Sequence, residues 1–190
     1  MILKNNILLN KYKWWMIPIG IGGVILIYIK RKSIMEYTQE KVWDLVSETR
    51  ILTLHPKVRD KAREFINKAE KQNIKLRVAS AYRTYAEQND LYAQGRTKAG
   101  KIVTNAKGGQ SSHNFGTAID VVPIVNGKAD YNTDWNKIAT LGKSVGFAWG
   151  GDWTSIKDKP HFEMNFGNTL AQLQTKYKNG QLTDGYVQLA

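Results

Sequence analysis

Two hydrophobic periodicities follow one another in the middle of the chain. Between residues 56 and 72, apolar residues recur at helical spacing, which predicts an amphipathic helix. Residues 74–79 alternate between apolar and polar, as in a strand with one buried face. Residues 85–94 predict a second helix, which ends at Gly95.

The second half of the chain mixes short elements with loops. Residues 107–116 are rich in Gly, Ser and Asn and predict a loop. The elements expected after it are a buried strand over 117–122 stopped by Pro123, short strands around the Asn126-Gly127 turn, a helix over 135–145, and a strand over 161–164. Helices and strands do not alternate regularly, so the expected fold class is α+β.

The N-terminal part carries an uncharged run of 16 residues, 14–29, between two groups of cations. As a helix it would be about 24 Å long, slightly short of the roughly 30 Å core of a bilayer. Trp14, Trp15 and Tyr28 stand at its ends, as interfacial aromatics do. We expect one hydrophobic helix that anchors the chain in a membrane. A cleaved signal peptide, a weak anchor that leaves the membrane and a buried soluble helix are the alternatives.

The expected organisation follows from these patterns. Residues 1–32 form the anchor or signal segment, 33–40 a polar linker, 41–178 the globular domain and 179–190 a short tail. The chain has no cysteine, which excludes disulfides and thiolate metal sites. Its net charge of +12 suits an anionic partner such as cell wall or acidic lipid. No basic run is interleaved with aromatics, so we expect no nucleic-acid partner.

Two of the three histidines lie in segments suited to binding a metal. His113 is followed seven residues later by Asp120, and His161 comes about forty residues beyond. Two imidazoles and one carboxylate supply three zinc ligands and leave one position open. Asp158, three residues before His161, could accept a proton from water. The alternatives are a surface or capping role for His113 and a solvated turn for Asp158, whose flanking lysines favour its ionised form.

Several motifs, in this order, carry a resemblance to a known family. They are Leu54-His55-Pro56-x-Val58, Ala81-Tyr82-Arg83-Thr84, Glu87-Gln88-x-x-Leu91-Tyr92-Ala93-Gln94-Gly95-Arg96-Thr97, Val103-Thr104-Asn105-Ala106, Ser111-x-His113-x-x-Gly116-x-Ala118-x-Asp120, Trp149-Gly150-Gly151-Asp152-Trp153 and Asp158-x-Pro160-His161. Over roughly residues 38–175 the chain resembles the zinc D-Ala-D-Ala carboxypeptidase and dipeptidase family, within it the L-alanyl-D-glutamate endopeptidase branch. The resemblance implies a small antiparallel sheet flanked by helices, as in hedgehog and D-Ala-D-Ala peptidase domains.

The resemblance also implies catalytic roles. His113, Asp120 and His161 would hold one zinc ion, and Asp158 would be the general base. Arg83 would hold the scissile carbonyl oxygen, a role that suits a permanently charged guanidinium with several donors. Without the family, Arg83 would be expected to pair with Glu87, four residues on in the next helix.

A second group of residues is expected to bind substrate or brace the ligands. It comprises Ser111, Gln88, Trp149, Asp152 and Trp153. Asp152 also competes with Asp158 as a ligand or base, but the family match favours Asp158.

The implied activity is hydrolysis of peptidoglycan stem peptides, in wall remodelling or lysis. Aspartate rather than glutamate at position 158 favours the L-Ala-D-Glu bond. The alternatives are D-Ala-D-Ala cleavage on the same scaffold and a non-catalytic wall-binding module. We expect a monomer attached to the inner or cytoplasmic membrane through residues 14–29, with the peptidase domain outside the cytoplasm.

Overall fold

The computed structural model describes residues 22–154 and 156–189. It contains two compact units, which divide between Gln39 and Glu40. Helix α1 (Gly22–Leu52) runs across this division. Residues 33–40, expected as a polar linker, are therefore helical. The domain limits drawn from the sequence stay predictions.

The expected membrane location is corrected by the structure. Residues 14–21 of the expected anchor lie outside the described residues. In the part that is described, no helix has the length and apolar character needed to span a membrane. The apolar stretch at the start of α1 covers only residues 22–29 before three consecutive cations, whereas a spanning helix needs about 20 apolar residues. The expected membrane-anchored location, and the separate hydrophobic helix on which it depended, are therefore not supported.

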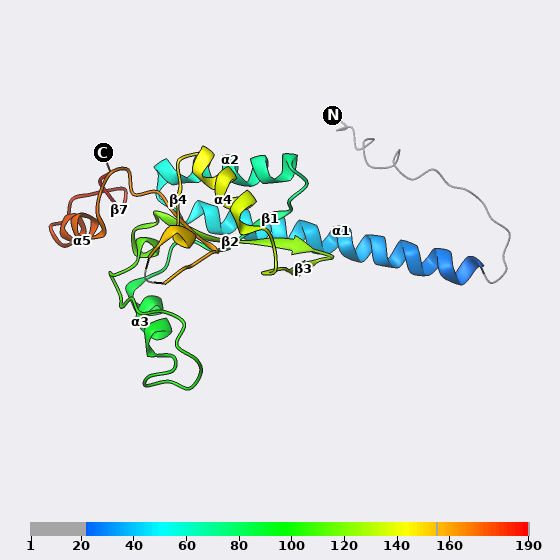
Figure 1. Ribbon diagram of the computed structural model, residues 1–190, viewed down its shortest axis with the longest axis horizontal. Helices are drawn as coiled ribbons and strands as arrows, with labels where there is room; N and C mark the ends of the chain where they lie inside the picture. Colours follow the sequence, from blue (N-terminus) through cyan, green and yellow to red (C-terminus); the bar gives the residue numbers. More distant parts are fainter. Residues whose placement is uncertain (1–21, 155, 190) are drawn as a thin grey trace, which may run out of the picture. The chain divides into compact units, whose positions relative to one another are not determined.

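A small antiparallel sheet organises the second unit (Figure 1). Its strands are β1 (Leu76–Ser80), β2 (Ala118–Val125), β4 (Ala148–Trp149) and β5 (His161–Glu163), in the order β1-β2-β5-β4. A short β3 (Lys128–Ala129) pairs with the end of β2 through the Asn126-Gly127 turn. Both turn residues have positive φ, as a tight hairpin requires. The expected mixed fold with a small antiparallel sheet is confirmed.

Two helices cover one face of this sheet, α2 (Pro56–Lys71) and α4 (Trp135–Ser144) (Figure 1). Phe65 from α2 and Ile138 from α4 are fully buried with Phe162 from β5. The Phe65 and Phe162 rings lie 4.8 Å apart. Because side chains of a strand alternate between its faces, burying Phe162 sends its neighbours His161 and Glu163 to the opposite face.

The end of α1 covers the edge of the sheet that is formed by β1. The backbone N–H of Val78 in β1 donates to Ser47 Oγ at 3.1 Å. Arg50 Nη1 donates to the Val78 carbonyl at 2.8 Å. Side chains of α1 thus replace the hydrogen bonds that a further strand would make with β1.

The other elements are α3 (Tyr85–Ala93), α5 (Leu170–Lys178), β6 (Leu182–Thr183), β7 (Tyr186–Val187) and two 3-10 turns, η2 (Ser112–Phe115) and η3 (Gly150–Asp152). Two details differ from the sequence patterns. Strand β2 continues through Pro123, whose carbonyl accepts from Asp130 N at 2.9 Å. Residues of the expected tail form the β6–β7 hairpin, with Asp184 and Gly185 both at positive φ.

Candidate metal centre

Strand pairing places two of the predicted ligands next to each other. Asp120 in β2 is directly opposite His161 in β5. On its other side Asp120 is paired with Ser80, at an irregularity in β1. The site therefore lies on the sheet face that α2 and α4 leave free.

His113 reaches this face from η2, which leads into β2. Its backbone carbonyl accepts from Arg83 N at 3.1 Å. Gly116 ends the turn at a φ of 68°. A Cβ at Gly116 would lie 2.6 Å from the backbone nitrogen of His55, so only glycine fits here. The close approach of these two segments fixes where His113 enters the site.

Three ligand atoms converge at the centre. His113 Nε2 lies 3.2 Å from Asp120 Oδ1 and 3.2 Å from His161 Nδ1. His161 Nδ1 lies 3.3 Å from Asp120 Oδ1. Tetrahedral ligands about 2.0–2.1 Å from zinc are separated by about 3.3 Å. The three residues thus fit a tetrahedral metal ion in donor type and in spacing.

The remaining nitrogen of each imidazole faces a hydrogen-bond acceptor. His113 Nδ1 lies 2.6 Å from the carbonyl of Ala81. His161 Nε2 lies 3.2 Å from Glu163 Oε2. Since these acceptors hold the ring protons on the outer nitrogens, the inner nitrogens keep the lone pairs that a metal needs.

Ionised Asp120 attracts a cation to the cluster, and the proton on His161 competes with it. Burial opposes ionisation of Asp120, but the His113 and His161 rings outweigh it and hold the pKa of this carboxyl well below its usual range. Burial would lower the pKa of His161, yet Asp120 and Glu163 raise it to about 9. Metal binding requires the neutral ring, so it must displace this proton.

Asp158 lies in the turn that leads into β5. Its carbonyl accepts from His161 N at 3.3 Å, and its own N–H donates to the Gly150 carbonyl at 3.1 Å. Burial, and then repulsion from Asp120, raise the pKa of Asp158. The flanking lysines are exposed and do not outweigh this burial. A carboxyl with a raised pKa is better matched to accepting a proton near neutral pH.

The guanidinium of Arg83 points to the cluster rather than to Glu87. Arg83 Nη2 lies 3.6 Å from Asp120 Oδ2 and donates to Ser80 Oγ at 3.0 Å. Glu87 instead completes a capping box with Thr84 at the start of α3. The helix cap thus takes the carboxylate that could have paired with Arg83.

Comparison with known proteins shows the family to which the chain belongs. Residues 104–164 match the family described as D-alanyl-D-alanine carboxypeptidase. The chain is 40 % identical over 122 residues to the peptidoglycan L-alanyl-D-glutamate endopeptidase CwlK of Bacillus subtilis, covering 58 % of this chain and 73 % of CwlK. The chain belongs to this peptidase family. The resemblance expected from its motifs is confirmed, and the protein is a metallopeptidase.

Two further proteins are similar to the chain. The L-alanyl-D-glutamate peptidase of Listeria phage A118 is 28 % identical over 113 residues, covering 55 % of this chain and 36 % of the phage protein. The crystal structure of the L-Ala D-Glu endopeptidase ChiX of Serratia marcescens covers 63 % of this chain and 86 % of its own, with 22 % identity and a TM-score of 0.46.

The residues expected to bind substrate in this peptidase have different structural roles. Gln88 is fully buried, and its Oε1 accepts from Arg83 Nη1 at 2.6 Å while its Nε2 donates to the Ala106 carbonyl at 2.8 Å. Gln88 therefore braces Arg83. Ser111 caps η2 through a 3.4 Å contact from His113 N.

The three candidate residues in and around η3 also differ in burial and contacts. Trp149 is buried and donates from Nε1 to the Lys159 carbonyl at 2.7 Å, so it braces the turn that carries Asp158. Trp153 is 38 % exposed, and its ring lies 4.9 Å from the ring of His161. Asp152 is exposed and pairs with Lys143 at 2.6 Å. The described metal cluster does not include Asp152.

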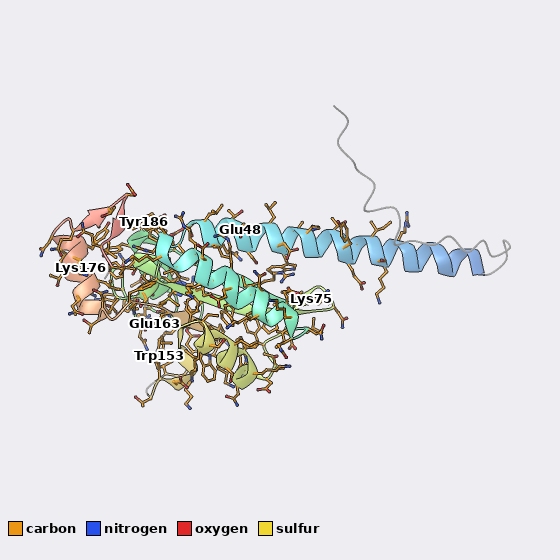
Figure 2. The ribbon with its side chains drawn as sticks, turned by 90° about the horizontal axis from the view of Figure 1, so that it is seen from above. Glu48, Lys75, Trp153, Glu163, Lys176 and Tyr186 are labelled. Carbon is orange, nitrogen blue, oxygen red and sulfur yellow. The ribbon has the colours of Figure 1, made fainter. Side chains whose placement is uncertain are left out.

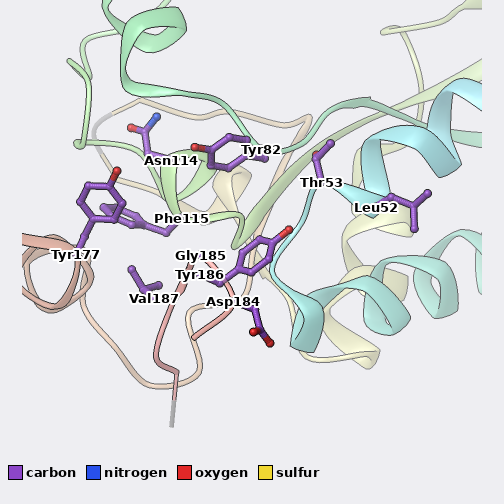
Figure 3. A pocket seen from close by; sticks show the side chains of 10 residues that line it. All are labelled: Leu52, Thr53, Tyr82, Asn114, Phe115, Tyr177, Asp184, Gly185, Tyr186 and Val187. Atoms are coloured by element: carbon purple, nitrogen blue, oxygen red, sulfur yellow. The ribbon is translucent and has the colours of Figure 1, made fainter. Parts of the chain in front are cut away.

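Two hollows lie next to the metal cluster, and neither is lined by its three ligands. One of about 500 Å³ is lined by Tyr82, Tyr177 and Tyr186, among others (Figure 3). Another of about 450 Å³ is lined by Arg83, Glu87 and Leu91. Both share Thr53 and Tyr82. Tyr82 therefore stands where the two hollows meet, one residue before Arg83.

Four residues at the site were not identified from the sequence: Ser80, Ser112, Glu163 and Asn165. Glu163 follows His161 by two residues in β5, so the alternation of strand side chains was a usable signal for it. The others depend on strand register and on a long-range contact, which the sequence does not display.

Proposed function

We propose that this chain is a zinc-dependent endopeptidase that hydrolyses the bond between L-alanine and D-glutamate in peptidoglycan stem peptides. The observation that carries the proposal is the 40 % identity to CwlK, a peptidoglycan L-alanyl-D-glutamate endopeptidase. The converging ligand atoms of His113, Asp120 and His161 supply the matching chemistry.

We assign one zinc ion to these three residues. Two imidazoles and a carboxylate suit zinc, although nickel and copper can also bind such donors. A zinc ion held there would polarise the scissile carbonyl and lower the pKa of the attacking water.

The protein's own groups would then carry the proton and the developing charge. Asp158 accepts a proton from the attacking water and passes it to the D-glutamate nitrogen as the carbon–nitrogen bond breaks. Arg83, positioned by Gln88 and Ser80, donates hydrogen bonds to the carbonyl oxygen as that oxygen gains negative charge. The hollow that Arg83 shares with Tyr82 is the proposed site for the stem peptide next to the cut bond.

Replacing Arg83 with lysine should lower kcat by about 10²–10³-fold, the usual effect of losing an oxyanion donor. Lysine keeps the charge but cannot donate to Gln88, Ser80 and substrate in the fixed geometry of a guanidinium. Steady-state kinetics on a soluble L-Ala-D-Glu-containing peptide measure the effect. Arg63→Lys makes the same change at a partly buried arginine of α2 that pairs with Glu48, so it is the matched control and should leave kcat unchanged. An Arg83→Lys enzyme with kcat like that of Arg63→Lys would contradict the assigned role.

The proposed function is tested by incubating the full chain with purified sacculi, with zinc and with a chelator. Mass spectrometry identifies the released fragments. Stem peptides that begin at D-glutamate, seen only with metal, are the expected result. Metal-loaded, folded protein that releases no product would contradict the proposal and favour a binding module.

The same experiment separates a second candidate, D-Ala-D-Ala cleavage. The observation in its favour is the family match, since residues 104–164 fit the D-alanyl-D-alanine carboxypeptidase family. Release of free D-alanine or of its dipeptide, with the L-Ala-D-Glu bond intact, would select this candidate. All residues of the proposed site come from a single chain. Light scattering tests the monomeric state that the sequence analysis expects.

A further inference from the structure

Glu163 occupies a position beside the metal cluster that the proposed mechanism does not use. It lies on the same face of β5 as His161, because Phe162 between them is buried in the core. Glu163 and Trp153, both labelled in Figure 2, contact the His161 ring from two different segments of the chain. The side chain of Glu163 is 23 % exposed.

The contact between Glu163 and His161 fixes which ring nitrogen carries the proton. Glu163 Oε2 lies 3.2 Å from His161 Nε2, while Nδ1 of the same ring faces Asp120 Oδ1 at 3.3 Å. An ionised carboxylate can only accept, so Nε2 must donate. In the neutral ring that metal binding requires, His161 Nδ1 then carries the free lone pair, and this nitrogen points at the cluster.

A chain of polar side chains holds Glu163 in place. Ser112 Oγ donates to Glu163 Oε2 at 2.7 Å. Asn165 Nδ2 donates to Ser112 Oγ at 3.3 Å, and Thr117 Oγ1 donates to Asn165 Oδ1 at 2.6 Å. Ser112 and Thr117 are buried, so their hydroxyls find hydrogen-bond partners within the protein rather than in solvent.

This chain of contacts joins the segments of two ligands. Ser112 immediately precedes His113 in η2, and Glu163 follows His161 in β5. A shift of η2 against β5 would break the Ser112–Glu163 bond and turn the His161 ring. The same bond therefore fixes the separation of the two imidazoles.

Glu163 is not itself placed as a ligand or as the base. Its carboxylate faces the outer nitrogen of His161, and it is not part of the described cluster of ligand atoms. We propose that Glu163, oriented by Ser112, is a positioning residue that fixes the tautomer and ring angle of His161 and so raises the affinity of the site for its metal. The proposal rests on the metal site of the proposed function, but not on the identity of the bond that is cut.

The test is the zinc dissociation constant of the full chain, measured by competition with a chromophoric chelator. Glu163→Ala should weaken zinc binding by about 10–100-fold, the usual effect of losing an outer partner of a ligating histidine. Glu163→Gln should weaken it less, because the amide oxygen can still accept from His161 Nε2. Glu64→Ala, at a glutamate of α2 whose side chain is 42 % exposed, is the matched control and should bind zinc like the unaltered protein.

Ser112→Ala supplies a readout that a merely structural role would not produce. If Ser112 acts through Glu163, it should weaken zinc binding in the unaltered chain but have little further effect on Glu163→Ala, because residues of one network are not additive. Cobalt(II) spectra of each variant report whether the ligand geometry changes. Circular dichroism of the metal-free proteins confirms that each variant is folded.

The proposal is overturned if folded Glu163→Ala binds zinc within twofold of the control, or if the Ser112 and Glu163 effects add in full. It is also overturned if Glu163→Gln is as weak as Glu163→Ala. None of these measurements needs a substrate. Failure to cut stem peptides would therefore count against the proposed function alone.

Discussion

Replacing His113 with alanine is expected to abolish metal binding and peptidase activity together. His113 Nε2 is the atom that lies 3.2 Å from both of the other ligand atoms. Its ring is buried and fixed by the Ala81 carbonyl. Two remaining ligands cannot hold the ion in a site that keeps a position open for water. Zinc content of the purified protein and hydrolysis of an L-Ala-D-Glu peptide measure the two losses.

The third histidine of the chain supplies the control. His55 caps α2, where its Nδ1 accepts from Lys57 N at 3.2 Å and its Nε2 contacts the Val187 carbonyl at 3.0 Å. Asparagine also caps helices well, so His55→Asn should keep zinc and activity. A His113→Ala protein that hydrolyses the peptide at the unaltered rate without metal would exclude the proposed mechanism.

Replacing Asp158 with asparagine should separate metal binding from turnover. An amide cannot accept a proton from water, and general bases contribute about 10²–10⁴-fold to rate. We expect a loss of kcat of that size with zinc content unchanged, because the three ligands stay in place. Isothermal titration with zinc and single-turnover hydrolysis of the same peptide measure the two effects.

Asp60→Asn makes the same chemical change on the exposed surface of α2. It should leave both measurements as they are in the unaltered enzyme. If Asp158→Asn lost zinc in parallel with activity, Asp158 would be a ligand. If it kept full activity, another group would be the base. Asp152 would be the first to examine, because it directly precedes Trp153, whose ring lies 4.9 Å from the ring of His161.

Much of the site was predictable because its ligands lie in local patterns. The strand over 117–122 was visible as an apolar run, a short strand was also expected after Pro160, and each carries one ligand. That Asp120 and His161 are directly opposite one another depends on strand register. Register arises from packing of the whole sheet and is not written in either segment.

Helices with a strong apolar periodicity, such as α2, were predictable from the sequence. Helical segments that depend on tertiary contacts were not. Residues 33–40 lie within α1, although the sequence indicated a linker there. Ser47 and Arg50 of this helix are ordinary polar residues until β1 lies beside them. The raised pKa of Asp158 was likewise hidden, because burial by distant segments outweighs the lysines next to it.

The way α1 covers β1 bears on how far the chain can be shortened. Without residues 47–50, the backbone groups of Val78 would face solvent at the open edge of the sheet. Exposed strand edges recruit other strands and lead to aggregation. A minimal peptidase fragment should therefore start before this helix turn and not at the first catalytic motif. Trimming to the metal-binding segments alone would favour insoluble intermolecular sheets over a working enzyme.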